Sequence, residues 1–454
     1  MTLKPYEQYK EVNLPWLDKV PVHWDLVRNK NVMTLKKDIV GDQHNNYTLL
    51  SLTLRGIIAR DMENFKGKFP KDFSTYQAVE KGDMVFCLFD IDETPRTVGL
   101  SPLNGMITSA YTVFKIKNVN KKYLYYYYLF LDNNKLLKPL YTGLRKVIST
   151  DTFLRTKIAL PTRMEQDQIV KYLDFQLTKI DRFIKTKKKL ISVLKEQKQA
   201  VTNEAVTKGL NPKVQMKPSG VEWLGEIPDN WETVRCKYLF REIDTRSTTG
   251  LETHLSMSQK HGLIPNEQLN ERRLLSENYI GGKVCKKDDL VLNRLKAHLG
   301  VFALAPQTGV ISPDYTVLRP NERIYPIYAE IVLKSLKCRR ELRIRVRGIV
   351  EGFWRLYTDD FYNIILPLPK YEEQLLIVDY INQMSQSINS TIARIEKEIE
   401  LITEYRTRLI SDIVTGQVDV RNIEINEAQL NEIEMQDNEE ELEEEILESE
   451  ECEV

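Results

Sequence analysis

The residues that could carry catalysis are scattered, and their spacing matches no motif of known chemistry. The sequence contains neither the GxxxxGK[ST] loop that holds nucleotide phosphates nor the GxGxxG turn that holds a dinucleotide. The Asn/Asp-Pro-Pro-Tyr/Phe run that amino-methyltransferases use is also absent, as is the zinc-binding HExxH spacing. The five histidines are His23, His44, His254, His261 and His298. The sequence therefore predicts a chain that is not itself an enzyme and that holds no cofactor or metal.

The cysteines and the apolar segments indicate the compartment. An odd number of cysteines without a CxxC pair argues against both a disulfide framework and a zinc site. They are Cys87, Cys236, Cys285, Cys338 and Cys452. No run approaches the roughly 18–20 apolar residues of a membrane helix, and residues 1–6 lack the apolar core of a signal peptide. We therefore expect a cytoplasmic protein.

The charge is segregated along the chain. Residues 421–454 contain fifteen acidic residues and one basic residue, so this tail carries −14 and residues 1–420 carry +14. A basic body indicates an anionic partner, with nucleic acid as the first candidate. A solvated surface with an incidental excess of charge is the alternative. The tail itself has the composition of a disordered segment.

An internal repeat organises the chain. Residues 16–30, WLDKVPVHWDLVRNK, return as residues 223–237, WLGEIPDNWETVRCK, and seven of the fifteen positions are identical. Four of the five tryptophans lie in this repeated element. His23 is replaced by Asn230, although a duplicated active site would keep its catalytic residue. We therefore interpret His23 as an ordinary surface or core histidine and the repeated tryptophans as core or interface anchors.

The similarity continues along both halves at nearly the same offset. The matching pairs are 81–86 and 287–292, 111–113 and 315–317, 150–153 and 358–361, and 160–170 and 366–378. The acidic pair Asp288-Asp289 corresponds to Gly82-Asp83, so only one carboxylate is shared. A turn that leads into a strand explains this pair better than nuclease metal ligation does. Short β-type runs separated by Gly, Pro and Asp turns predict a mixed α/β domain in each half.

A long helix is predicted to follow each domain. Apolar residues recur in steps of four and three from position 173 to 205, except at Lys187 and Lys198, and from 388 to 413, except at Arg406. This period of 3.5 residues is typical of a coiled-coil seam, which the two helices can bury against each other within one chain. A dimeric or solenoid coiled coil is the alternative. Thr162 and Glu165 have the spacing of a capping box, and Gly209 has the place of a left-handed helix cap.

Together these patterns predict the fold class α/β, with two tandem mixed α/β domains that are each followed by a long helix. The expected boundaries are 1–160 for the first domain, 161–210 for its helix, 211–221 for a linker, 222–367 for the second domain, 368–420 for its helix and 421–454 for the acidic tail.

The paired arrangement resembles the specificity (S) subunit of type I restriction–modification enzymes. The residues that carry the resemblance are Trp16, Pro21 and Trp24 with Leu160-Pro161 and Glu165-Gln166 in the first half, and Trp223-Leu-Gly225, Ile227-Pro228 and Trp231 with Leu366-Pro367, Pro369 and Glu373-Gln374 in the second. The first half departs from the pattern at Leu17–Val20 and at Thr162-Arg163. The acidic tail is not part of it.

The resemblance implies two target-recognition domains that each read one part of a split DNA sequence. Their helices would pair as an antiparallel coiled coil with pseudo-twofold symmetry. This pair would act as a spacer and as a docking surface for two methyltransferase (modification) subunits, and restriction/translocase subunits would join the same complex. S-adenosylmethionine, ATP and Mg would then belong to the partner subunits and not to this chain.

Within such domains, basic side chains would contact phosphates, and arginine can pair bidentately with guanine. The candidates are Arg55, Arg60, Arg96, Arg145 and Lys146 in the first domain, and Arg272, Arg273, Arg294, Lys296, Arg343, Arg345 and Arg347 in the second. For each of them a solvated surface position is the alternative. The alternation of arginine between 343 and 347 would also suit an exposed strand.

Two other functions fit parts of the sequence. A coiled-coil scaffold with protein-binding α/β domains would share the repeat and the helices, but it would not show the salt-dependent DNA binding of a phosphate-contacting protein. A self-contained restriction–methylation enzyme would need the cofactor motifs that the sequence lacks. We expect a non-catalytic DNA-recognition subunit.

Overall fold

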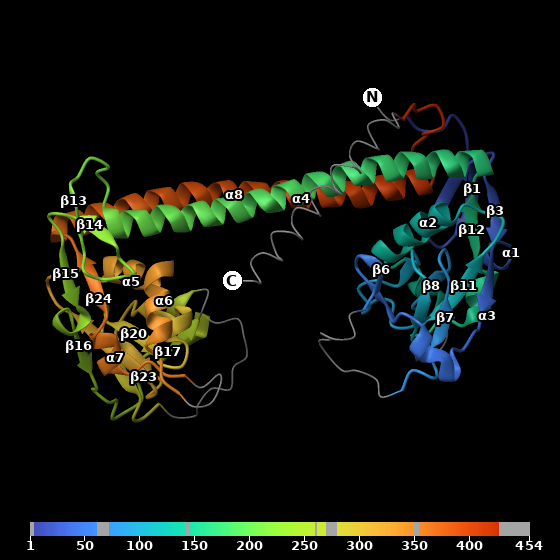
Figure 1. Ribbon diagram of the computed structural model, residues 1–454. Coiled ribbons are helices and arrows are strands. Elements are labelled where there is room, and N and C mark those ends of the chain that lie inside the picture. Colours follow the sequence, from blue (N-terminus) through green and yellow to red (C-terminus); the bar gives the residue numbers. More distant parts are fainter. Residues whose placement is uncertain are drawn as a thin grey trace. The chain divides into compact units, whose positions relative to one another are not determined.

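The computed structural model describes residues 4–60, 72–141, 146–258, 261–268, 279–348 and 354–425. The chain divides into two compact units, one of Met1–Lys187 with Lys397–Val454 and one of Lys188–Glu396. Each unit contains one α/β domain and part of each of two long helices, α4 (Arg163–Lys208) and α8 (Tyr371–Val414) (Figure 1). The acidic tail lies outside the described residues from position 426 onward, so the disorder expected there stays a prediction.

The first domain precedes α4 and is built from short strands and helices. In chain order they are β1 (Tyr9–Leu14), β2 (Leu17–Pro21), β3 (Asp25–Arg28), α1 (Asn29–Val32), β4 (Met33–Lys36), η1 (Gly41–Asn46), β5 (Leu50–Thr53), β6 (Gly56–Ala59), β7 (Gln77–Val79), β8 (Met84–Phe86), β9 (Val98–Leu100), β10 (Gly105–Ile107), β11 (Thr112–Ile116), α2 (Lys121–Asn133), η2 (Lys138–Leu140), α3 (Thr150–Arg155) and β12 (Lys157–Leu160).

The second domain lies between α4 and α8 and repeats this order. Its elements are β13 (Met216–Pro218), β14 (Glu226–Pro228), β15 (Glu232–Arg235), η3 (Cys236–Tyr238), β16 (Phe240–Ile243), β17 (Leu255–Ser258), β18 (Gly262–Pro265), η4 (Asn266–Gln268), β19 (Lys283–Cys285), β20 (Leu290–Asn293), η5 (Ala297–Leu299), β21 (Phe302–Leu304), β22 (Gly309–Ile311), β23 (Tyr315–Pro320), α5 (Pro326–Lys334), α6 (Leu336–Ile344), α7 (Thr358–Tyr362) and β24 (Ile365–Leu368).

A four-stranded antiparallel sheet is the centre of each domain. Its strand order is β4-β11-β8-β9 in the first domain and β16-β23-β20-β21 in the second, so the repeat seen in the sequence is also a repeat of topology. Side chains alternate across the sheet, as the pleat of a strand requires. Met84 and Phe86 belong to the main core with α2, whereas Val85 between them packs beneath the β5–β6 hairpin. Leu290, Val291 and Leu292 divide in the same way in the second domain.

The two long helices run antiparallel along the predicted seam. Within the first unit, Asp181 of α4 pairs with Arg406 of α8, and Lys187 pairs with Glu398. Within the second unit, Lys198 donates to Asn389 over 3.1 Å. The residue number on α8 falls as that on α4 rises, which establishes the antiparallel pairing. Each unit joins the beginning of one helix to the end of the other.

The main core of each unit includes both helices as well as the domain. In the first unit, Ile169 and Leu173 of α4 lie in one cluster with Ile413 and Val414 of α8. In the second unit, Ala205 and Val206 of α4 join Ile377 and Val378 of α8. The domains are therefore packed onto the helix pair and are not merely tethered to it.

The helix ends confirm one prediction and correct another. Gly209 follows the last residue of α4 with a φ of +74°, and its N–H donates to the carbonyl of Ala205, as expected for a left-handed cap. The capping box predicted at Thr162 and Glu165 is wrong. The carboxylate of Glu165 is buried and accepts hydrogen bonds from the β1–β3 region, because a partner distant in sequence competes with the local backbone N–H.

The strand alternative for residues 343–347 is also wrong. Arg343 and Ile344 are the last residues of helix α6, whose N-cap Ser335 accepts a hydrogen bond from the N–H of Cys338. The sequence separation of Cys338 and Leu342 places both on the buried face of this helix. Arg347 alone of this group lies in a β-bridge, opposite Arg355.

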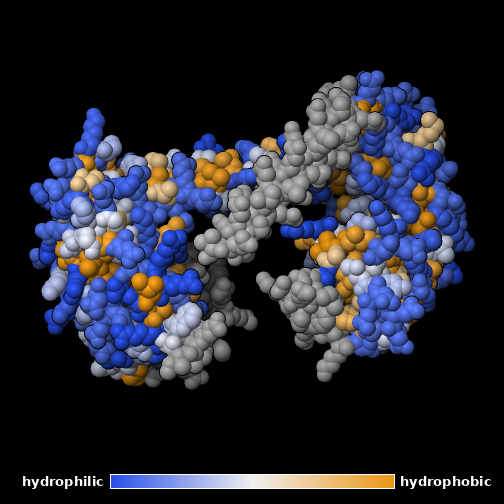
Figure 2. All heavy atoms as spheres, in the orientation of Figure 1, coloured by the Kyte–Doolittle hydropathy of each residue, from blue (hydrophilic) through white to orange (hydrophobic). Residues whose placement is uncertain are grey.

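The outer surface is largely polar. On the face shown in Figure 2, hydrophilic residues predominate and hydrophobic residues gather in small separate groups. In the part of the chain that the structure describes, no helix has both the length and the apolar character that crossing a membrane requires.

Candidate DNA interface

The repeated tryptophan and glutamate form the same contact in both units. In the first unit, the indole N–H of Trp24 donates to Glu165 Oε1 over 3.0 Å. In the second unit, the indole N–H of Trp231 donates to Glu373 Oε1 over 3.0 Å. Both tryptophans are fully buried. This contact fixes the strand pair at the start of each domain to the first turn of the following long helix.

His23 precedes Trp24 and contacts the same glutamate as this tryptophan. Its Nε2 lies 2.8 Å from Glu165 Oε2, and the amide of Asn230, the counterpart of His23, donates to Glu373 Oε2 over 3.3 Å. Histidine and asparagine therefore supply the same contact. His23 thus takes part in the joint between the first domain and its helix.

The glutamine of each Glu-Gln pair binds backbone groups of its domain. Gln166 Oε1 accepts from the N–H of Asn120, and its amide donates to the carbonyl of Pro161. Gln374 makes the corresponding contacts with the N–H of Tyr325 and the carbonyl of Pro369. Both glutamines are at most 2% exposed. They attach α2 and α5, which begin beside Asn120 and Tyr325, to the long helices.

The shared acidic turn has a structural role as well. Asp83 Oδ2 accepts from the N–H of Glu80 and from Lys36, and Asp289 accepts from the N–H of Lys286 and from both ends of the Arg319 fork. Asp288, the unshared acid, has a φ of +68° where Gly82 has +91°. The turn interpretation is confirmed. Among the described residues, no group of three or more His, Cys, Asp or Glu could hold a metal ion.

The four cysteines that the structure describes are buried. Burial raises the pKa of each thiol, to about 11 for Cys285. A thiol whose pKa is raised carries little thiolate near neutral pH, which is the form needed for nucleophilic attack and metal binding. Cys87, Cys236, Cys285 and Cys338 are therefore core residues.

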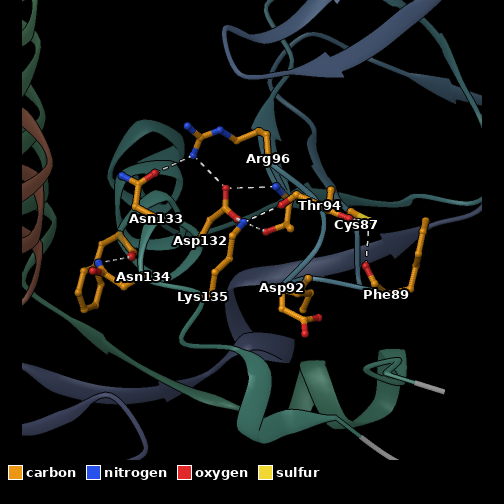
Figure 3. A network of polar contacts seen from close by, with 12 residues as sticks. Cys87, Phe89, Asp92, Thr94, Arg96, Asp132, Asn133, Asn134 and Lys135 are labelled. Atoms are coloured by element: carbon orange, nitrogen blue, oxygen red, sulfur yellow. Dashed lines mark hydrogen bonds and ion pairs between the residues drawn. The ribbon is translucent and has the colours of Figure 1, made fainter. Parts of the chain in front are cut away.

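In the first domain, Arg96 is held by an internal network (Figure 3). Its guanidinium lies 2.9 Å from Asp132 Oδ2 and 3.0 Å from Asn133 Oδ1. Asp132 is 1% exposed and also accepts from Thr97 and Lys135. Lys135 in turn donates to the carbonyl of Thr94. These contacts tie the segment between β8 and β9 to the end of α2, so the charge of Arg96 is already neutralised within the fold.

The remaining candidates of the first domain occupy different surroundings. Lys146 pairs with Asp92 and Glu93, and these two hydrogen-bonded carboxylates raise its pKa. Arg55 is exposed at the tip of the β5–β6 hairpin, and Arg60 follows β6. Arg145 lies outside the described residues. Arg96 and Lys146 thus both belong to or contact the segment between β8 and β9, whereas Arg55 and Arg60 lie on and after the hairpin.

In the second domain, Arg294, Lys296, Arg343 and Arg347 lie on or beside the segment that follows β20. Arg294 follows β20, and the carbonyl of Arg294 accepts from the N–H of Leu356. Arg347 and Arg355 form a β-bridge just before Leu356. The segment after β20 also contains Lys296 and His298, and the ring of His298 contacts Trp354 edge to face. Burial and the charge of Arg343 lower the pKa of His298, which places α6 beside this segment. Arg272 and Arg273 lie outside the described residues.

Some of the basic side chains of this region have hydrogen-bond or ion-pair partners within the protein, and others are exposed. Arg294 donates to Thr316 over 2.7 Å, Arg345 to Glu341 over 2.8 Å, and Arg347 pairs with Asp360. Lys296 and Arg343 are exposed. The sequence did not single out Trp354 or Arg355 for this surface. Trp354, the one tryptophan outside the repeated element, was the available signal.

Comparison with known proteins gives one consistent result. The model of the type I restriction modification DNA specificity domain matches residues 104–196 and 228–401. A relative, the type I restriction enzyme MjaVIII specificity subunit of Methanocaldococcus jannaschii, is 26% identical over 447 residues, which cover 91% of this chain and 98% of that protein.

A solved structure with the same fold comes from a type I R-M system. A chain of a type I R-M system, solved to explain complex assembly and conformational transition, aligns with a TM-score of 0.62 at 15% identity, covering 88% of this chain and 99% of that one. The HsdS subunit from Thermoanaerobacter tengcongensis aligns with a TM-score of 0.47 at 16% identity over 88% of this chain and 98% of that one.

The family model covers more than half of the chain, on both sides of the linker between the two domains. Specificity subunits of this family recognise DNA for type I restriction–modification systems and are not catalytic. This chain therefore belongs to the family of type I restriction–modification DNA specificity subunits.

Proposed function

We propose that this chain recognises a DNA target in two parts, with one α/β domain for each part. The observation that carries the proposal is that one fold occurs twice, and that each copy is joined by the same Trp–Glu contact to its own part of an antiparallel helix pair. The two copies share their framework and differ in their surface residues. The basic group runs through Arg294, Lys296 and Arg343 in the second domain, whereas Asp90, Asp92 and Glu93 occupy the corresponding segment in the first. Two copies with different surfaces suit two different half-targets.

The helix pair is proposed to set the length of the unread gap between the half-targets. Helices α4 and α8 contain 46 and 44 residues, so each is about 65–70 Å long at a rise of 1.5 Å per residue. This length exceeds one turn of DNA, which is about 34–36 Å. We also propose the boundaries expected from the sequence as the functional divisions of the chain into two domains, two helices, a linker and a tail.

The exposed faces of the helices are proposed to dock the modification subunits. Leu376 and Leu401 of α8 and Val193 of α4 are half-exposed or more. In the second unit, a groove of about 820 Å³ lies between the two helices and the α5–α6 pair, lined by apolar residues such as Ile331, Ile381 and Ile392 and by Lys195 and Lys198. Restriction subunits would join the same complex. S-adenosylmethionine, ATP and Mg would act in those partners.

A spacer-length variant tests the gap. One extra heptad in α4 near Lys188, together with one in α8 near Glu396, keeps the apolar seam in register. It would lengthen the helix pair by about 10 Å, the rise of about three base pairs. We expect the variant, assembled with its modification subunits, to methylate the same two half-targets at a longer separation. Methylation of the unchanged sequence would contradict the proposal.

Salt dependence separates this function from that of a protein-binding scaffold. A protein that neutralises several phosphates loses affinity steeply as salt rises, because bound counterions are released from the DNA. We expect such a slope for this chain, and a scaffold would show none.

A further inference from the structure

The β5–β6 hairpin of the first domain is a rigid arm with an exposed tip. Leu50 and Ile57 on its inner face are 2% and 3% exposed, and they pack on Val85 and Val113 of the central sheet. At Gly99 of β9, a Cβ atom would lie only 2.7 Å from Ile57 Cγ1 and from Leu52 Cδ1. The hairpin thus lies directly on the sheet backbone, which leaves it little freedom to move.

The turn at the tip is also fixed. Thr53 Oγ1 accepts from the N–H of Arg55 over 3.1 Å and donates to the carbonyl of Gly56 over 3.0 Å. Gly56, which pairs with Thr53 across the two-residue turn, has a φ of +98°, a conformation that favours glycine. The second domain has an equivalent hairpin, β17–β18, in which Gly262 has a φ of +71°. Residues 259 and 260 at its tip lie outside the described residues, so the inference concerns the first domain.

This turn directs Leu54 and Arg55 away from the domain. Leu54 is 67% exposed, and Arg55 is also exposed. Among the described residues, no carboxylate pairs with the guanidinium of Arg55, whereas Asp132 holds Arg96, and Asp92 and Glu93 hold Lys146. Arg55 therefore has its charge and its hydrogen-bond donors free for a ligand outside the fold.

We propose that the β5–β6 hairpin enters the DNA major groove and that Arg55 reads a guanine in the half-target of the first domain. A two-stranded β-ribbon fits the major groove, and the planar guanidinium can donate to both O6 and N7 of guanine. Leu54 beside it supplies the apolar contact that a thymine methyl group accepts. The rigid seat of the hairpin favours binding, since no ordering of the arm is needed. The inference rests on the proposed function, because it names a residue of that interface.

The test compares Arg55→Ala and Arg55→Lys with Arg155→Ala in the full complex, on the duplex target that the wild-type complex methylates. Arg155 is an arginine of the same domain, 73% exposed, and among the described residues it pairs with Asp151 alone, so it is the matched control. We expect Arg55→Ala to weaken target binding about tenfold or more and to lose the preference for guanine at one position. Arg55→Lys keeps the charge but not the fork, and should lose the same preference while keeping the salt dependence.

Modified bases identify the contact atoms. Replacing that guanine by 7-deazaguanine removes N7, and it should weaken the wild type but not Arg55→Ala. Replacing the neighbouring thymine by uracil removes the methyl group, and it should weaken the wild type but not Leu54→Ala. If 7-deazaguanine weakens binding by the wild type and by Arg55→Ala equally, the proposed arginine contact is wrong. If uracil weakens binding by the wild type and by Leu54→Ala equally, the proposed leucine contact is wrong.

Two further results would overturn the inference. One is an Arg55→Ala complex that binds like the wild type. The other is an Arg55→Ala complex that loses affinity equally for every sequence, which is the behaviour of a phosphate contact. A wild-type complex without sequence-specific, salt-dependent binding would instead contradict the proposed function, so the two failures are distinguishable. Equal melting temperatures of the variants exclude misfolding as the cause.

Discussion

Trp24 and Glu165 are joined by a hydrogen bond of 3.0 Å between an indole N–H and a carboxylate that are both buried, 141 residues apart in the sequence. Trp231 and Glu373 repeat it at the same distance. The Glu165 site is the more enclosed of the two, because the hydroxyl of Tyr6 also donates to Glu165 over 2.6 Å. The motif that marks the repeat is thus the joint between domain and helix.

Removing this carboxylate should therefore destabilise the two units unequally. We expect Glu165→Ala to lower the free energy of unfolding by about 2–4 kcal/mol, because the donors of Trp24 and Tyr6 lose their buried acceptor. Glu373→Ala should cost about 1–2 kcal/mol, since Glu373 is partly exposed. Urea unfolding monitored by tryptophan fluorescence measures both, with the exposed Glu204→Ala on α4 as the control. Equal costs for the two sites would contradict this description.

The glycines that end the two helices make a second matched pair. Gly209 and Gly416 have φ values of +74° and +73°, so an added side chain strains both backbones equally. At Gly416 a Cβ would also lie 2.7 Å from Pro21 Cγ, whereas at Gly209 the nearest atom is Trp231 Cζ2 at 3.1 Å. We expect Gly416→Ala to destabilise by about 1 kcal/mol more than Gly209→Ala does. A larger loss at Gly209, measured by thermal denaturation, would refute the steric argument.

The buried thiols predict both reactivity and pH dependence. In a Cys452→Ser variant, the remaining four cysteines should resist a thiol reagent at pH 8 until the protein unfolds, because burial raises their pKa. A raised thiol pKa means that the folded state keeps protons that the unfolded state releases above about pH 8.5. Stability should therefore be unaffected below that pH and fall as the pH rises above it. Rapid labelling of the folded variant, or stability that increases from pH 8 to 10, would argue against the burial.

The basic residues should separate into two classes when they are substituted. Lys296→Ala and Arg343→Ala remove exposed charges from two neighbouring segments of the second domain, and each should reduce the slope of log K against log salt by about 0.9 if it contacts a phosphate. Arg96→Ala instead removes a partner of the buried Asp132, and it should lower the melting temperature while leaving the slope unchanged. Filter binding over a range of salt concentrations measures the slopes. Unchanged slopes for Lys296→Ala and Arg343→Ala would remove this group from the interface.

The sequence predicted the framework well because the framework follows periodic and repeated patterns. The 3.5-residue seam placed Leu173, Ile180, Ile392 and Ile413 on the buried faces of α4 and α8, where they are at most 9% exposed. Even the polar exception Lys187 has a physical reason, since it reaches Glu398 across the helix pair. The resemblance to the specificity subunits rested on the same repeated residues and is confirmed.

The surface could not be predicted to the same depth, because it depends on tertiary partners. The sequence identifies Arg96 and Arg55 equally as cations. Only the fold shows that Asp132 neutralises Arg96 and that Arg55 is exposed. The spacing of Thr162 and Glu165 suggested a local cap, but Trp24 and Tyr6 approach Glu165 from another part of the chain. Likewise, the arginines from 343 to 347 alternate as in a strand, although the buried Cys338 and Leu342 belong to a helix.

The central claim is that two copies of one domain read two separated parts of a DNA target for partner subunits that methylate it. Sequencing of methylated bases across the genome of the source cells, with and without this gene, tests it most directly. The account predicts a methylated motif of two short specified parts with an unspecified gap between them, and complete loss of that motif when the gene is deleted. An uninterrupted motif, or a motif that persists without the gene, would contradict it.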